Sequence, residues 1–116
     1  MKHQKSSCFG KKISLECSSV KTTLDAIGGK WKPLILFLLH KQTLRFNQLQ
    51  KGIDGITQKM LTQQLRELEK DRLITRKIYP EVPPRVEYSS TEFGKTLIPV
   101  FKQMHTWGQT YRLKVN

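Results

Sequence analysis

The chain has 116 residues, which suffices for one small domain with a modest core. Its 21 Lys and Arg outnumber its 9 Asp and Glu, and the net charge of +12 predicts a polyanionic partner, nucleic acid ahead of an anionic membrane surface. The longest apolar run, 34–39, falls far short of the roughly 20 residues that a membrane-spanning helix needs. Two cysteines are too few for a secreted disulfide framework, and no apolar run follows the N-terminal lysines as in a signal peptide. We therefore expect a cytoplasmic protein without a membrane partner.

The N-terminal residues 1–16 carry four lysines before the first acid, Glu16, and few large apolar groups. This composition predicts a flexible basic arm that precedes a folded domain at 17–116.

Short helical elements are predicted in the first half of the domain. A helical apolar stripe with a serine cap covers 18–27, and a glycine pair ends it. A second and more apolar helix covers 30–40, with Pro33 in its first turn, where a missing N–H does little harm. A short extended connector at 43–45 leads into a compact third helix that ends near Gly52.

The next stretch, 57–71, predicts an amphipathic helix with a polar face of unusual composition. Thr57 is placed to cap its start, and apolar residues recur at steps of three and four. These are Met60, Leu61, Leu65 and Leu68. The other face is basic or neutral until Glu67 and carries Gln58, Lys59, Thr62, Gln63 and Arg66. Gln pairs bidentately with adenine and Lys or Arg with guanine, so this face suits the edges of bases. The alternative is an ordinary solvated helix face.

A β-hairpin is predicted directly after this helix. Residues 73–79 and 86–90 are rich in β-branched and aromatic residues, and the three prolines of 80–85 belong in the loop between them. Arg85 is expected near the tip, either in a minor groove or on a phosphate. Two helices with a tight turn followed by such a hairpin are typical of a winged helix-turn-helix, although any αα-hairpin shares the first part of the pattern.

The chain ends with a helix predicted at 91–112, capped by Thr91 and kinked by Pro99. Its apolar stripe is longer than a small winged domain can bury, so we expect it to form a homodimer interface with the first helix. The alternative is that it packs on its own domain. The expected interface residues are Val20, Leu24, Leu97, Phe101, Met104, Trp107 and Tyr111.

Three blocks, 27–39, 45–74 and 79–100, resemble the HxlR-type subset of the MarR-like bacterial transcription regulators. The resemblance implies a mainly α fold with a small β-hairpin wing and with N- and C-terminal dimerisation helices. It implies a homodimer on a pseudo-palindromic double-stranded DNA operator. In that family the helix matching 57–71 enters the major groove, and the hairpin tip matching 80–85 contacts the flanking DNA.

The resemblance also draws attention to Cys17, because many family members sense electrophiles or oxidants through a cysteine just ahead of the first helix. Cys8 is a candidate resolving thiol for the same chemistry. The sequence departs from the family at Ser18-Ser19, where a proline commonly follows the cysteine, and at Arg72, where glycine is common. The alternative is that Cys17 is a small apolar filler.

Other classes of protein fit the sequence less well. No nucleophile motif is present, and His3, His40 and His105 are too scattered for a zinc site, so we expect no catalytic residues, no metal and no cofactor. The main rival is a basic RNA-binding or architectural protein that reads no sequence. A small-molecule effector pocket is a further alternative, lined by Trp31, Phe101, Trp107 and Tyr111.

The sequence therefore predicts a transcriptional regulator that is not an enzyme. We expect the polar face of 57–71 to contact base edges, two cations to contact phosphates, and the wing to add one contact. The base-reading residues are Gln58, Lys59, Thr62 and Gln63. The phosphate contacts are Lys32 and Arg66, and the wing contact is Arg85. Thr57 orients the helix and is a candidate donor to a phosphate.

Overall fold

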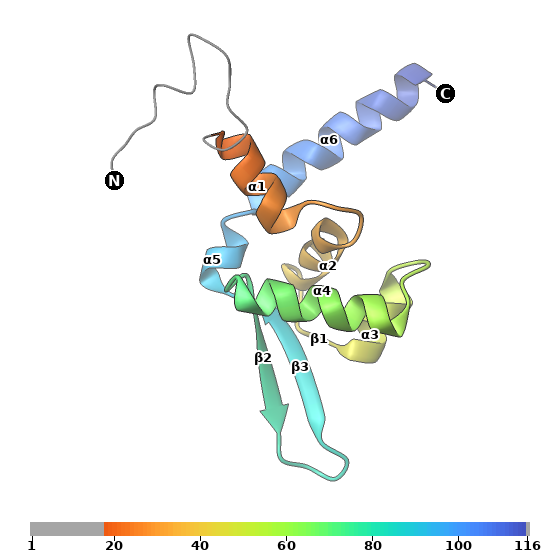
Figure 1. Ribbon diagram of the computed structural model, residues 1–116. Coiled ribbons are helices and arrows are strands. Elements are labelled where there is room, and N and C mark those ends of the chain that lie inside the picture. The colour runs from red at the N-terminus through yellow and green to blue at the C-terminus, as the bar shows by residue number, and fades with distance from the viewer. Residues whose placement is uncertain (1–17, 116) are drawn as a thin grey trace, which may run out of the picture.

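A computed structural model describes residues 18–115, so the predicted arm and both cysteines lie outside the described residues. The elements in chain order are α1 (Ser19–Ile27), α2 (Lys32–Leu39), β1 (Leu44–Arg45), α3 (Phe46–Gly52), α4 (Gln58–Lys70), β2 (Ile74–Tyr79), β3 (Arg85–Ser90), α5 (Glu92–Lys95) and α6 (Ile98–Val115). The β2–β3 hairpin projects from one end of the body, whereas α6 projects from the other (Figure 1). The predicted winged helix-turn-helix fold, mainly α with a hairpin wing, is confirmed.

The three strands form one small antiparallel sheet in the order β1-β3-β2. The hairpin register runs from Ile74 opposite Ser90 to Tyr79 opposite Arg85, and β1 pairs Leu44 with Tyr88. The prolines of residues 80–84 lie in the connecting loop, outside the ladder of hydrogen bonds, because a proline has no N–H to donate. The sheet thus anchors the wing to the connector in front of α3.

The core lies between α2, α3, α4 and the base of the sheet. On α4, Leu61, Leu65 and Leu68 are fully or almost fully buried, as the apolar spacing predicts. The Thr57 hydroxyl accepts a hydrogen bond from the N–H of Met60 at 3.1 Å, which confirms the predicted cap. One face of α4 is therefore fixed against the core, and its polar face is turned to solvent.

The C-terminal segment differs from the prediction of a single kinked helix at 91–112. It forms the short α5, a turn at 96–97, and then α6. Pro99 has no N–H and its ring would clash with the preceding turn inside a continuous helix, so the chain restarts and Pro99 falls in the first turn of α6. The predicted cap is correct, since the Thr91 hydroxyl accepts from the N–H of Gly94 at 2.8 Å.

The turn from α4 to β2 holds Arg72 in the left-handed region, with φ at 65°. The N–H of Leu73 donates to the Leu68 carbonyl, and the N–H of Arg72 donates to the Glu69 carbonyl, each at 3.0 Å. This pair of bonds is a Schellman motif, which usually has glycine where Arg72 stands. The departure from the family pattern at this residue is thus a site of backbone strain.

We expect Arg72→Gly to raise the free energy of unfolding by about 1 kcal/mol, because glycine adopts this backbone conformation without a Cβ clash. Urea denaturation followed by circular dichroism measures the change. Lys70→Gly, a control inside the last turn of α4, should lower the same quantity. A less stable Arg72→Gly protein would contradict the strain at this turn.

Candidate nucleic-acid interface

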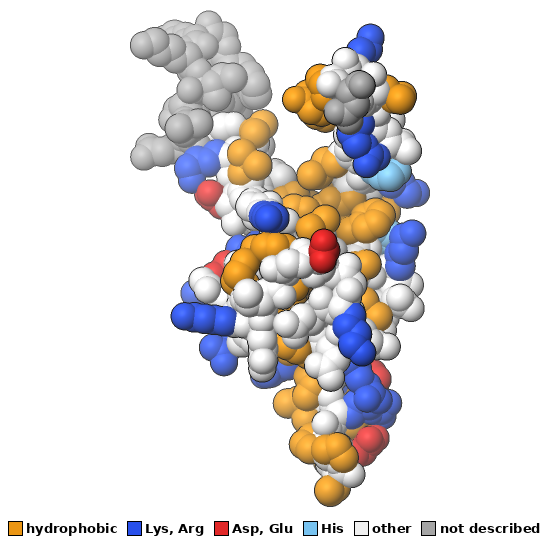
Figure 2. Space-filling view, turned by 90° about the vertical axis from the view of Figure 1, so that its right-hand side faces the viewer, with side chains coloured by type: hydrophobic (Ala, Val, Ile, Leu, Met, Phe, Trp, Pro, Cys, Tyr) orange, Lys and Arg blue, Asp and Glu red, His pale blue; other side chains and the backbone are white. Residues whose placement is uncertain are grey.

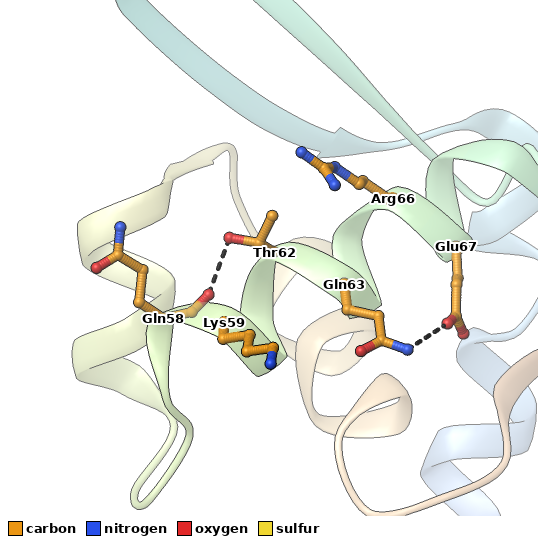
Figure 3. Close-up of a pocket in the computed structure, with 6 residues that line it drawn as sticks. All are labelled: Gln58, Lys59, Thr62, Gln63, Arg66 and Glu67. Carbon is orange, nitrogen blue, oxygen red and sulfur yellow. Dashed lines mark hydrogen bonds between the residues drawn. The ribbon is translucent and has the colours of Figure 1, made fainter.

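The polar face of α4 is a shallow hollow on the surface, lined by Gln58, Lys59, Thr62, Gln63, Arg66 and Glu67 (Figure 3). Five of these six residues are the ones that the sequence assigns to DNA contacts. The Thr62 hydroxyl donates to the Gln58 carbonyl at 2.8 Å, so it keeps only acceptor capacity for a ligand. The hollow therefore combines amide, hydroxyl and cationic groups on one exposed helix.

Glu67 is the acidic member of this face, and the sequence gives it no role. Its carboxylate accepts from the Lys32 ammonium at 2.6 Å and from the Gln63 side-chain amide at 3.2 Å. The hydrogen bond from Lys32 holds the pKa of the Glu67 carboxyl below its ordinary value, and the bond from Gln63 adds to this effect. The four-residue spacing between Gln63 and Glu67 is the sequence signal that identifies such a pair.

Lys32 is placed differently from its expected role as a phosphate contact. It is the first residue of α2, its side chain is only 11% exposed, and its ammonium is engaged by Glu67. The structure makes Lys32 a partner of α4, and the expected phosphate contact, which would compete with this ion pair, stays a prediction.

Arg85 is also placed differently, because it lies opposite Tyr79 in the last pair of the hairpin and not at the tip of the loop. Its guanidinium contacts the carboxylates of Glu81 at 3.0 Å and Glu87 at 3.2 Å, and it covers the Tyr79 ring at 3.9 Å. Two carboxylates thus offset its charge, and the expected contact of Arg85 with a minor groove or a phosphate stays a prediction. The fully exposed tip residue is Val82.

Two cations on the polar face of α4 remain available to a polyanion. Among residues 18–115, Lys59 and Arg66 form no ion pair. Arg66 points toward the strands of the wing (Figure 3). Arg76 lies opposite Tyr88 in the sheet, and its guanidinium is 3.8 Å from the Glu69 carboxylate. Burial raises the pKa of the Tyr88 hydroxyl. Lys59 and Arg66 thus supply the unpaired positive charge of the hollow on α4, whereas Arg76 in the sheet is paired with Glu69.

A second surface is apolar and lies on α1 and α6. Figure 2 shows hydrophobic side chains on both projecting helices and in the hollow between them. The Trp107 side chain is 67% exposed and stacks on Tyr111, with ring centroids 5.1 Å apart. The exposed members of this surface are Val20, Leu24, Met104, Trp107 and Tyr111. We refer to these five residues as the apolar surface.

Two residues expected at a dimer interface belong instead to the core of the domain. Phe101 is buried, and Leu97 is half-buried against the core, because the first turn of α6 packs on the body before the helix projects away. The four aromatic residues of the expected effector pocket are separated for the same reason. Trp31 and Phe101 pack in or against the core, whereas Trp107 and Tyr111 are exposed on α6.

Two further findings concern the described part of the chain. Within residues 18–115, no group of three or more His, Cys, Asp or Glu side chains is arranged as metal ligands. No helix in the same range is long and apolar enough to cross a membrane.

The fold and the surface of α4 define a winged helix-turn-helix protein that binds DNA. The profile of the HxlR-like helix-turn-helix family matches residues 26–115, and the chain belongs to this family. YdeP, an HTH-type transcriptional regulator of Bacillus subtilis, is 54% identical over 97 residues, which cover 84% of this chain and 76% of YdeP. The chain is thus a transcriptional regulator of the helix-turn-helix type.

Solved structures agree with this assignment. The reduced form of the redox regulator HypR superposes with a TM-score of 0.79 at 50% identity, over 82% of this chain and 94% of HypR. The reduced form of the transcriptional regulator YodB from Bacillus subtilis superposes with a TM-score of 0.72 at 34% identity, over 82% of this chain and 93% of YodB.

Proposed function

We propose that the protein is a cytoplasmic homodimer that represses or activates transcription by reading a pseudo-palindromic operator with α4. The observation that carries this proposal is the division of α4 into two faces. Leu61, Leu65 and Leu68 hold one face in the core, while the amide, hydroxyl and cationic groups of the other face stand free in solvent. A reading surface needs this rigidity, because side chains must meet base edges in one orientation.

Within the proposed interface, four residues of the first two turns of α4 contact base edges and Arg66 contacts a phosphate. The base contacts are Gln58, Lys59, Thr62 and Gln63. Thr57 keeps the N-terminus of α4 ordered through its cap. The wing lies beside the DNA, where Arg85 is the proposed wing contact and its ion pairs with Glu81 and Glu87 order the loop.

The homodimer is proposed from the apolar surface. Exposed apolar side chains on two adjacent projecting helices are unusual for a monomer and mark an interaction site. A twofold dimer places two copies of α4 about one helical turn of DNA, roughly 34–36 Å, or a multiple of it, apart. The operator should therefore consist of two half-sites related by a dyad.

The principal alternative remains a basic protein that binds nucleic acid by charge alone. A regulator prefers its operator over random duplex by about 10³-fold or more at moderate salt, whereas such a protein shows little preference and binds structured RNA at least as well. Selection of bound duplexes from random DNA separates the two functions, and the presence of a dyad in the selected sequences tests the dimer.

We propose that oxidants or electrophiles regulate the protein through Cys17, which lies outside the described residues. HypR is named a redox regulator and was solved in reduced and oxidised forms, and YodB was solved after treatment with diamide. In the proposed step a peroxide oxidises the Cys17 thiolate to a sulfenic acid, which condenses with a second thiol and releases water. The second thiol is Cys8 or Cys17 of the other subunit. A small-molecule effector is the alternative signal.

Gln63→Ala should weaken operator binding by about 1–3 kcal/mol and relax the base preference at one position of each half-site, because a bidentate base contact is lost. Competition binding with single-base operator variants measures both effects. Gln42→Ala, in the exposed turn before β1, is the control and should change neither. Intact base preference in Gln63→Ala would remove this residue from the reading surface.

Trp107→Ala should weaken dimerisation at least about tenfold, because a large exposed aromatic side chain is a typical interface hot spot. Sedimentation velocity over a range of protein concentrations measures the effect. Ile78→Ala on the wing, a control at a comparably exposed apolar residue, should leave the dimer unchanged. A Trp107→Ala protein that dimerises like the wild type would exclude this part of the apolar surface.

Oxidant treatment should weaken operator binding, and Cys17→Ser should abolish that response while it leaves binding by the reduced protein intact. Operator titrations with diamide and with peroxide, each reversed by dithiothreitol, measure the effect. Cys8→Ser should retain a response if the thiols of two subunits react, and lose the disulfide if Cys8 is the resolving thiol. An unchanged response in Cys17→Ser would exclude Cys17 from the mechanism.

A further inference from the structure

Glu67 lies inside the proposed reading surface, yet an uncompensated carboxylate there would repel DNA. Both of its oxygens are occupied, Oε1 by the Lys32 ammonium and Oε2 by the Gln63 amide. Figure 3 shows the Gln63 side chain turned along the helix toward Glu67, with the dashed line joining the two. The Lys32 ammonium thus holds the Glu67 carboxylate, and this carboxylate holds the Gln63 amide that is proposed to contact a base.

The carboxylate determines which way the Gln63 amide faces. An ionised carboxylate offers only acceptors, so it selects the amide nitrogen Nε2 of Gln63 and excludes Oε1 from the same place. The pKa of Glu67 is lowered, which favours the ionised form of its carboxyl group. One N–H and the Oε1 of Gln63 are left for a ligand in the hollow.

Lys32 makes this arrangement rigid. It begins α2, whose residues Ile35 and Leu36 are fully buried, so its backbone is fixed by the core. Its side chain is 11% exposed, and its ammonium lies 2.6 Å from the Glu67 carboxylate. An ion pair with one partner this little exposed is less screened by salt than a pair at the surface. The core helix α2 therefore fixes the position of a side chain on the exposed face of α4.

We propose that Lys32 and Glu67 are positioning residues for sequence recognition, which lock the Gln63 amide in the orientation that reads adenine and rejects guanine. Adenine presents an acceptor and a donor side by side in the major groove, which match the free N–H and the Oε1 of Gln63. Guanine presents two acceptors, N7 and O6, and would need two N–H groups. One of these is committed to Glu67. This inference rests on the proposed reading of DNA by α4.

The experiment compares adenine and guanine at the half-site position that Gln63→Ala identifies, with duplexes selected from random DNA as probes. Glu67→Gln should reduce the preference for adenine over guanine about tenfold, because a glutamine amide can donate as well as accept and lets Gln63 rotate. Glu69→Gln is the matched control, since it removes one charge from the same helix without a contact to Gln63. It should change affinity for all duplexes alike.

Lys32 is tested by two substitutions that differ in charge. Lys32→Met should lower the preference for adenine over guanine as Glu67→Gln does. Lys32→Arg should keep the wild-type preference, because a cation at this position holds the carboxylate. Circular dichroism and urea denaturation of each variant show whether the fold is kept. A loss of affinity that is equal for both bases in Lys32→Met would show a merely structural ion pair and overturn the proposal.

A double-mutant cycle tests whether Glu67 acts through Gln63. In a Gln63→Ala background, Glu67→Gln should not change the adenine to guanine ratio further. The same change in both backgrounds, or no change in either, would overturn the inference. Failure of the proposed function is distinct, since the wild-type protein would then select no common sequence at all.

Discussion

The burial of three leucines of α4 is the constraint on which the proposed DNA interface depends. Leu61, Leu65 and Leu68 are spaced by four and three residues, so burying all of them leaves one rotation of the helix about its axis. That rotation turns Gln58, Thr62 and their polar neighbours outward together. The same apolar contacts that stabilise the domain therefore also fix which side chains face solvent at the proposed interface with DNA.

The C-terminal end of α4 fixes the position of the wing relative to this helix. The Schellman turn at Arg72 reverses the chain directly into β2, and the Thr91 hydroxyl donates to the Arg72 carbonyl at 2.7 Å from beyond β3. Helix α4 and the hairpin are thus joined by a short hydrogen-bonded turn and have little freedom to move apart. An L-residue in the left-handed region is tolerated here because the surrounding bonds determine the conformation.

The features that the sequence predicted well are those that neighbouring residues determine. The cap at Thr57, the stripe of α4, the two strands and the proline loop depend on spacing of a few residues, and the structure confirms them. The break before α6 was missed because Pro99 was placed inside a helix and not at the start of a new one. The placement of Lys32 was missed because its partner Glu67 is 35 positions away. The placement of Arg85 was missed because it depends on the register of the hairpin, which pairs Arg85 with Tyr79.

The observed positions of Lys32 and Arg85 change how much of the positive charge of the chain is available to a polyanion. A net charge of +12 attracts any polyanion, and that attraction carries no sequence information. At the interface, acids are few and each holds a cation in place: Glu67 holds Lys32, while Glu81 and Glu87 hold Arg85. In such a pair the cation attracts phosphate less strongly, but its side chain is held in one position. In the proposed complex, the unpaired cations Lys59 and Arg66 of α4 contribute attraction to phosphate, whereas the ion pairs hold their side chains in fixed positions beside the proposed reading surface.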